Sequence, residues 1–167
     1  MCIRDSEDPY HFWYIGKIYY DSTLGDYPLG MDHIKEYARR SIFYFGQYLN
    51  FKHDYHKTGK AKGIDELAYF ALYAMGDMSK LCGNYEKALD CGMRAEEFAP
   101  SRNEHIVLQA ECYKDLSDFD SMKLQTDRLM SPDRKLPFPQ YNFLLNMEHY
   151  NDSGKYCEEL HQIANQV

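Results

Sequence analysis

The chain has 167 residues, of which 44% are hydrophobic and 16% aromatic, and its formal net charge is −7. This apolar content excludes a disordered chain and predicts one packed domain or a short array of repeats. The negative charge argues against nucleic acid and anionic membranes as partners, and no apolar run reaches the length that spans a bilayer. Its five cysteines include no C-x-x-C pair. This pattern favours reduced thiols in a cytoplasmic protein over a disulfide framework or a zinc site.

The first residues, MCIRDS, resemble translated sequencing-adaptor sequence. Residues 1–7 are therefore interpreted as an artefactual or disordered leader, and the folded domain is expected to span 8–167. Arg4, Asp5 and Glu7 interrupt any apolar segment at the start, so the sequence predicts no signal peptide. On this interpretation, the natural N-terminus and any domain in front of it are missing from the chain.

The first helix pair is expected within 8–49. Asp8 and Pro9 suit the start of a helix, with Asp as the cap and Pro in the first turn. Gly16 follows at a position where a second helix could approach closely. A loop rich in Gly and Pro delays that partner helix, whose pattern runs over 31–49. The unit is therefore longer than its successors, through either a longer second helix or an additional helical turn.

Residues 50–64 are polar and rich in Lys and Gly, without an apolar period, which predicts a linker. His53, Asp54 and His56 could bind a metal ion, but a third firm ligand is lacking and a solvated polar loop is the simpler interpretation. We therefore expect no metal and no other cofactor. The lysines of this segment could meet an acidic partner or belong to a solvated hinge; they are Lys52, Lys57, Lys60 and Lys62.

The clearest helix pair lies within 65–100, with helices expected at 67–81 and 85–99. Gly83 suits the left-handed residue that ends a helix, and Asn84 can cap the next one, which a proline then stops. Such a pair cannot bury its apolar face alone, so it must stack on neighbours. Small residues stand where its two helices would touch: Gly76, Ala88 and Ala95.

The next unit is found by its period. Ala110 lies 34 residues after Gly76, which predicts a unit at 101–131 with helices at 103–116 and 119–130.

The start of this unit carries a predicted capping box at Ser101-x-x-Glu104, in which each side chain binds the backbone N–H of the other residue. After a Pro-rich connection, a fourth unit is expected at 139–167. The sequence therefore predicts four helix pairs.

The unit at 65–100 resembles the tetratricopeptide (TPR) repeat. The next copy matches the pattern at Ala110, Tyr113 and Phe119 but has Met122 where Ala is usual. The resemblance implies an all-α fold in which TPR-like antiparallel helix hairpins stack into a short right-handed solenoid. It is carried by the small, aromatic and terminal Pro positions Gly76, Tyr85, Ala88, Ala95 and Pro100.

In such an array the first helices of successive pairs line a concave face. That face is interpreted either as a groove for a peptide or a protein, with aromatic anchors and a floor of mixed charge, or as a solvated surface with some intramolecular packing. A clamp for C-terminal carboxylates is disfavoured because acidic side chains would repel the ligand. The candidate groove residues are Trp13, Lys17, Tyr73, Asp77, Lys80, Val107, Glu111, Lys114, Leu144 and Glu148.

No catalytic residue is expected in this chain. Cys91 and Cys112 fall inside predicted helices and are interpreted as small core residues. No base is spaced to activate either thiol. Glu96 and Glu97 are adjacent in a helix, so their carboxylates point in different directions.

Residues 67–119 are similar to the helical repeats that follow family 2 glycosyltransferase domains in bacteria and their viruses, and DPYHFWYIGKIYYD resembles the first such repeat. The resemblance implies a non-catalytic TPR-like interaction or spacer module, with any transferase activity in an upstream catalytic domain of the parent chain. The alternative is a stand-alone TPR adaptor that binds peptides or partner proteins in its concave groove. The resemblance is carried by Tyr69, Leu72, Gly76, Ala95, Pro100, Arg102 and Glu104.

Overall fold

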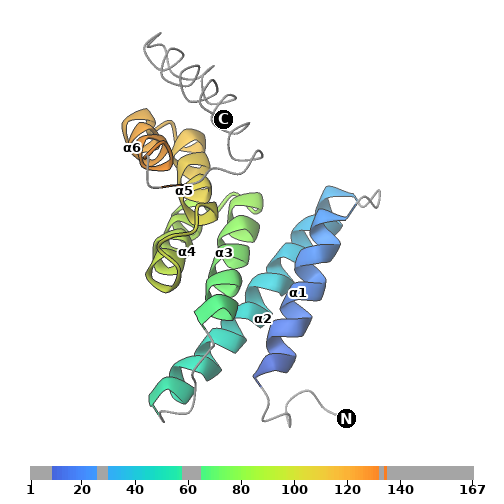
Figure 1. Cartoon of the computed structure of the whole chain (residues 1–167). Helices are drawn as coiled ribbons and strands as arrows, with labels where there is room; N and C mark the ends of the chain where they lie inside the picture. Colours follow the sequence, from blue (N-terminus) through green and yellow to red (C-terminus); the bar gives the residue numbers. More distant parts are fainter. Residues whose placement is uncertain (1–8, 26–29, 58–64, 132–133, 135–167) are drawn as a thin grey trace.

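The structure is a computed structural model that describes residues 9–25, 30–57, 65–131 and 134, without the side chains of 52–57 and 65. These residues form six α-helices and no strand (Figure 1). The predicted all-α class is confirmed. The helices are α1 (Tyr10–Leu24), α2 (Met31–Lys57), α3 (Asp65–Leu81), α4 (Tyr85–Phe98), α5 (Glu104–Asp115) and α6 (Phe119–Leu129).

The helices form three antiparallel hairpins, α1–α2, α3–α4 and α5–α6, which follow one another through space (Figure 1). Each hairpin packs on the next through α2 against α3 and α4 against α5. The first helices of the hairpins also touch in series, α1 against α3 and α3 against α5. This packing is consistent with the expected stack. The predicted leader at 1–7 and the predicted fourth unit at 139–167 lie outside the described residues.

Both turns inside the later hairpins close in the same way. Gly83 has a φ of +80°, and the backbone N–H of Asn84 donates to Ser79 O at 2.8 Å, as in a Schellman motif. The Asn84 side chain then caps α4 by accepting from the backbone N–H of Lys87. Both predicted roles are confirmed. In the next hairpin Ser117, with a φ of +60°, takes the left-handed position.

Glycine allows the hairpin helices to approach closely. A Cβ added at Gly76 would lie 2.6 Å from Leu108 Cδ2 and 3.2 Å from both Ala88 O and Cys91 Cβ. One added at Gly16 would lie 2.9 Å from the ring of Phe45. The predicted close contacts are therefore present, and Gly76 meets α5 as well as its own partner α4.

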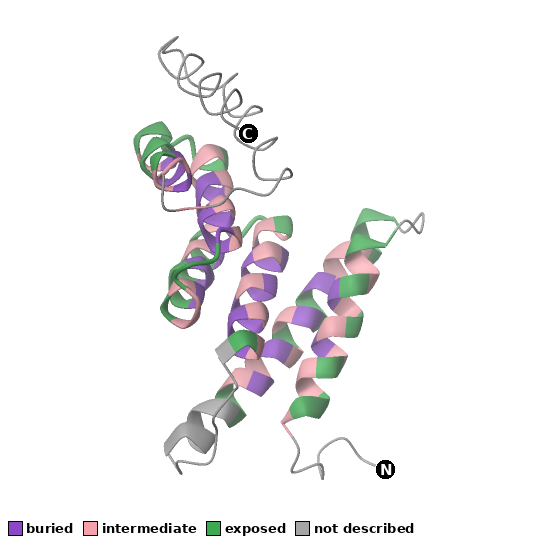
Figure 2. Ribbon diagram, viewed as in Figure 1, coloured by how far each residue is buried: buried purple, intermediate pink, exposed green. Residues whose placement is uncertain are grey.

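The core runs continuously through the first three helices and reaches α4 at Cys91. Buried residues lie on the sides of the helices that face neighbouring helices (Figure 2). Trp13, Phe45 and Phe70 pack edge-to-face or tilted, with ring centroids 5.6–6.3 Å apart, which is a favourable arrangement for aromatic pairs. Apolar burial between hairpins therefore adds to the burial within each one and stabilises the stack.

The longer first unit arises from a longer second helix. α2 continues through Lys57, so the predicted linker at 50–64 is helical over its first eight residues. Two physical features explain the difference: Phe51 stacks on Phe12 at 5.3 Å, and no Gly or Pro interrupts the sequence until Gly59.

The start of α5 also differs from the expectation. The helix begins at Glu104 after Asn103, so Ser101 does not cap it. The Glu104 carboxylate accepts from the backbone N–H of Asn103 at 3.1 Å and from the Tyr69 hydroxyl at 3.1 Å. The predicted capping box therefore does not form, and the Glu104 carboxylate binds Asn103 and Tyr69 instead.

We predict that Gly76→Ala destabilises the protein, because the added methyl group would collide with Leu108 and with the α4 backbone. The expected loss in the free energy of unfolding is about 1–3 kcal/mol, measured by urea denaturation. Gly46→Ala is the matched control, since its nearest neighbour would be Met75 Cε at 4.0 Å. That variant is expected to gain up to about 1 kcal/mol. Equal changes in both variants would contradict the close contact at Gly76.

Candidate functional site

Eight of the ten predicted groove residues lie on the first helices of the three hairpins, α1, α3 and α5. We call the surface they form the A-helix face. Leu144 and Glu148 lie outside the described residues. The eight described residues are Trp13, Lys17, Tyr73, Asp77, Lys80, Val107, Glu111 and Lys114.

A chain of polar contacts crosses the A-helix face and joins all three hairpins. The Tyr20 hydroxyl on α1 donates to Asp77 Oδ2 on α3 at 3.2 Å. Lys80 Nζ lies 3.9 Å from Asp77 Oδ1. The same ammonium group donates to Glu111 Oε2 on α5. One lysine thus bridges two carboxylates that come from different hairpins.

The charged groups in this chain of contacts are partly buried. Side-chain exposure is 22% for Asp77, 23% for Lys80 and 30% for Glu111. Burial raises the pKa of Asp77, although Lys80 opposes the rise. Burial alone would lower the pKa of Lys80, but the hydrogen bond to Glu111 and the two carboxylates raise it. The three charges are therefore paired with one another across two hairpins.

At the α1 end of the face, the two predicted groove residues are engaged within the chain. The Trp13 indole N–H donates to Leu67 O at 3.3 Å, and its ring packs on Phe70. Lys17 Nζ pairs with Asp21 at 2.7 Å. Trp13 therefore joins α1 to α3 and is not an open aromatic anchor.

Between α3 and α5 the face is aromatic. Tyr73 stacks on Tyr69 with centroids 6.4 Å apart, and the Arg102 guanidinium lies 4.9 Å from the centre of the Tyr69 ring, within cation–π range. Burial and nearby carboxylates raise the pKa of Tyr73. On α5, Val107 is half-buried and Lys114 lies 3.8 Å from Asp115.

Sequence reasoning missed Tyr20 and Tyr69 as members of this face. Tyr20 follows Gly16 by four residues, as Lys80 follows Gly76. The offset rule that selected Lys80 would therefore have selected Tyr20. Tyr69 stands one helical turn before Tyr73, and the same periodicity places both on one side of α3.

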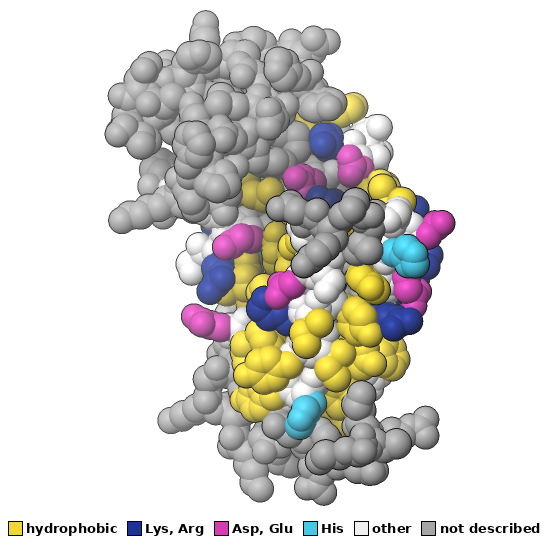
Figure 3. Space-filling model, turned by 90° about the vertical axis from the view of Figure 1, so that its right-hand side faces the viewer, with side chains coloured by type: hydrophobic (Ala, Val, Ile, Leu, Met, Phe, Trp, Pro, Cys, Tyr) yellow, Lys and Arg dark blue, Asp and Glu magenta, His cyan; other side chains and the backbone are white. Residues whose placement is uncertain are grey.

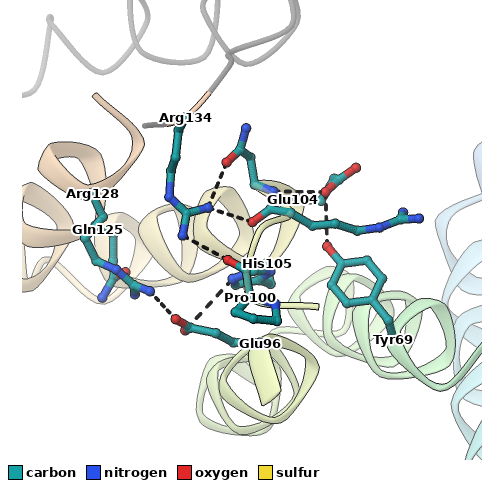
Figure 4. Close-up of polar contacts among 10 residues, drawn as sticks. Tyr69, Glu96, Pro100, Glu104, His105, Gln125, Arg128 and Arg134 are labelled. Atoms are coloured by element: carbon teal, nitrogen blue, oxygen red, sulfur yellow. Dashed lines mark hydrogen bonds and ion pairs between the residues drawn. The ribbon is translucent and has the colours of Figure 1, made fainter. Parts of the chain in front are cut away.

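A second polar cluster lies between α4, α5 and α6 (Figure 4). Glu96 pairs with Arg128, whose guanidinium also donates to Gln125 Oε1 at 2.6 Å. Fully buried His105 lies 3.9 Å from the same carboxylate. Neither of its ring nitrogens has a hydrogen-bond partner in the described part of the chain.

Arg134 connects the end of the described chain to this region. Its guanidinium donates to Pro100 O, Arg102 O and Asn103 Oδ1, each at 2.9 Å. These contacts hold the connection between α4 and α5 against the segment that follows α6 (Figure 4).

Burial lowers the pKa of His105 to about 4. Glu96 and Glu104 oppose this shift, whereas Arg128 and Arg134 reinforce it. The imidazole is therefore neutral near pH 7, and protonating it opposes folding.

The described residues offer no pattern of reactive groups. Burial raises the pKa of Cys91 to about 11 and that of Cys112 to about 12, so neither thiol is activated. No three His, Cys, Asp or Glu side chains in the described ranges are grouped to hold a metal ion. The side chains of His53, Asp54 and His56 lie outside those ranges.

One D-x-D sequence occurs, at Asp118-Phe119-Asp120. Asp118 caps α6 by accepting from the backbone N–H of Ser121 at 3.1 Å, and Asp120 is exposed in the first helical turn. The motif therefore starts a helix here. Separately, none of the described helices is both long and apolar enough for a membrane span.

We predict that Lys80→Met costs about 1–3 kcal/mol in the free energy of unfolding, because it leaves two partly buried carboxylates without their cation. Lys17→Met, which removes an exposed pair, is expected to cost less than about 0.5 kcal/mol. Chemical denaturation at neutral and acidic pH measures both. The loss in Lys80→Met should shrink in acid, where protonation removes the repulsion between Asp77 and Glu111. Equal losses would show that Lys80 acts as an ordinary surface charge.

We predict that the stability of the protein depends on pH through His105. As the pH falls from 6.5 to about 4, the unfolded chain takes up a proton that the folded chain does not. The free energy of unfolding should therefore decrease over this window, by about 3 kcal/mol, and this contribution should level off below it. His105→Leu should abolish this contribution. The exposed control His33→Gln should retain it, and a loss that persists in His105→Leu would assign the effect to other groups.

Comparison of the chain with protein-family models, with curated proteins and with solved structures gave no match. These comparisons therefore do not assign the chain to a family. What the described residues establish is a stack of helical hairpins whose first helices are joined by a chain of polar contacts.

Proposed function

We propose that this chain is a non-catalytic, TPR-like interaction or spacer module. The proposal is based on how the polar groups of the A-helix face are paired. Asp77, Lys80 and Glu111 bind one another across two hairpins. Cys91, Cys112 and His105 are buried, and burial raises the pKa of both thiols and lowers that of the imidazole. The contacts among Asp77, Lys80 and Glu111 hold two hairpins together. Such a role suits a module that positions other domains of a protein.

The resemblance to the repeats of family 2 glycosyltransferases supports the spacer form of this proposal. Several residues that carry it are structural here: Arg102 packs on Tyr69, Glu104 accepts from Tyr69, and Pro100 O accepts from Arg134. They build the junction between successive hairpins, which any chain with this stack requires. From this resemblance we propose that the chain is the C-terminal part of a longer enzyme whose catalytic domain lies upstream.

The alternative is a stand-alone adaptor with a peptide groove on the A-helix face. It is weaker because Lys80 is engaged by two carboxylates and Trp13 is packed between helices. Peptide binding would have to rest on the tyrosines of α3 and the residues of α5. The cytoplasmic location and the exclusion of nucleic acid follow from cysteine spacing and net charge, and they belong to the same proposal.

The first test asks whether the chain has activity by itself. Incubated with UDP-glucose or UDP-N-acetylglucosamine and Mn²⁺, the purified chain should release no more UDP than buffer. Release above buffer, abolished by a variant of this chain, would overturn the non-catalytic assignment. The second test extends the reading frame upstream of residue 8, where a family 2 glycosyltransferase domain is expected.

The third test separates the spacer from the adaptor. A displayed random-peptide library should yield no peptide whose binding depends on Tyr73. Peptides that lose binding with Tyr73→Ala but keep it with Leu124→Ala would favour the adaptor. Leu124 is the matched control because it is exposed on α6, away from the A-helix face.

A further inference from the structure

The two interfaces between the described hairpins differ in chemistry. At the first, where α3 packs on α1 and α2, Ala71 and Met75 lie in the apolar core that these helices share. The 34-residue period of the chain carries these two positions of α3 onto His105 and Gln109 of α5. At the second interface, where α5 packs on α4, an imidazole and an amide therefore stand where the first has apolar side chains.

Both of these polar side chains are buried without hydrogen-bond partners. His105 is fully buried and Gln109 is 2% exposed. Within the described part of the chain, neither ring nitrogen of His105 has a partner, and nor does Gln109 Nε2. Gly92 of α4 lies against the same stretch, since a Cβ there would be 3.5 Å from both His105 O and Gln109 Nε2. Buried polar groups without hydrogen bonds are destabilising, so the second interface is the weaker one in chemical terms.

The surroundings of His105 disfavour a proton on its ring. The guanidinium groups of Arg128 and Arg134 oppose protonation. The carboxylates of Glu96 and Glu104 favour it, but Glu96, 3.9 Å from the ring, is already paired with Arg128. His105 also lies in the first turn of α5, whose N-terminal end carries a partial positive charge. A buried imidazolium at this position would therefore be strongly unfavourable.

His105 lies between two hairpins (Figure 4). From the α3–α4 hairpin, the Tyr69 ring packs edge-to-face on the imidazole with centroids 5.9 Å apart, and Glu96 lies beside it. Burial and the Glu104 carboxylate raise the pKa of Tyr69, so its hydroxyl is neutral. From the α5–α6 hairpin, Arg128 approaches the same carboxylate. A proton on the ring would therefore lie at the contact between these two hairpins.

Acid does not act in this way at the first interface. Where α1 meets α3, Asp77 accepts from the Tyr20 hydroxyl. Burial raises the pKa of Asp77, so protonating this carboxylate does not oppose the folded state. The other histidines whose side chains the structure describes, His11 and His33, are exposed. Figure 3, which views the molecule from the side of α1, shows histidine side chains at the surface.

We propose that the interface between the α3–α4 and α5–α6 hairpins is an acid-sensitive joint. When His105 takes up a proton, the α5–α6 hairpin separates from α4 and the charged imidazole reaches water, while the core shared by α1, α2 and α3 stays packed. The joint does not depend on the role of the chain as a spacer.

The expected size of the effect follows from the two states of the imidazole. In the separated state its pKa is the ordinary value of about 6.5, whereas in the packed state burial lowers the pKa of His105 to about 4. The packed state therefore binds fewer protons over this window, and separation becomes more favourable as the pH falls. Between pH 7 and pH 4 the equilibrium constant for separation should rise about a hundredfold.

Two native thiols report on the two interfaces. Cys112 of α5 is fully buried and packs with Ala88 of α4. Cys91 is 1% exposed and packs in the core of the first interface. Labelling of the intact chain with dithiodipyridine, followed by peptide mass spectrometry, measures both rates. Each rate is divided by the rate of a short cysteine peptide at the same pH.

Cys112 should be labelled at least about tenfold faster than Cys91, because separation of one hairpin requires less free energy than global unfolding. Its relative rate should rise about a hundredfold from pH 7 to pH 4. His105→Leu and His105→Gln cannot take up the proton, so both should lose this rise. The exposed control His33→Gln should keep it. Circular dichroism confirms that each variant keeps its helices.

Two outcomes would overturn the joint. Equal rates for Cys91 and Cys112 at each pH would show that acid unfolds all the described helices together. A rise in the Cys112 rate that persists in both His105 variants would assign the sensitivity to another group.

Discussion

The structure depends on the close approach of three helices at Gly76. With no side chain there, Leu108 of α5 reaches the α3 backbone while α4 lies against the same point through Ala88 and Cys91. A hairpin of two short helices buries too little apolar surface to be stable alone. Contact between neighbouring hairpins supplies the rest, so the residues that decide stability are those that belong to two interfaces at once.

Polar contacts also connect neighbouring hairpins. The Tyr20–Asp77–Lys80–Glu111 chain of contacts connects three first helices, and the Glu96–Arg128 pair connects α4 to α6 beside His105. Most of these contacts join different hairpins, and the charged side chains are partly buried. Polar side chains that would suggest a binding groove in isolation are thus part of the stack.

Much of the fold was determined by the sequence because the signals are local. Gly83 at a positive φ and Asn84 as a cap act within one hairpin and set the boundary between α3 and α4, and Gly16 faces the second helix of its own hairpin. The 34-residue period carried the same assignment to the next hairpin. The all-α class and the consecutive packing of the described helices agree with these predictions.

Tertiary structure decided the features that depend on a neighbouring helix. α2 extends to Lys57 where Phe51 meets Phe12 of α1, and α5 begins at Glu104 where Tyr69 of α3 donates to that carboxylate. The eight described groove candidates fall on the first helices, as their spacing predicted, but Lys80 and Trp13 bind partners in other hairpins. Periodicity specifies which side of a helix a residue occupies. It does not specify which side chain of another helix lies opposite, because that depends on packing between segments distant in the sequence.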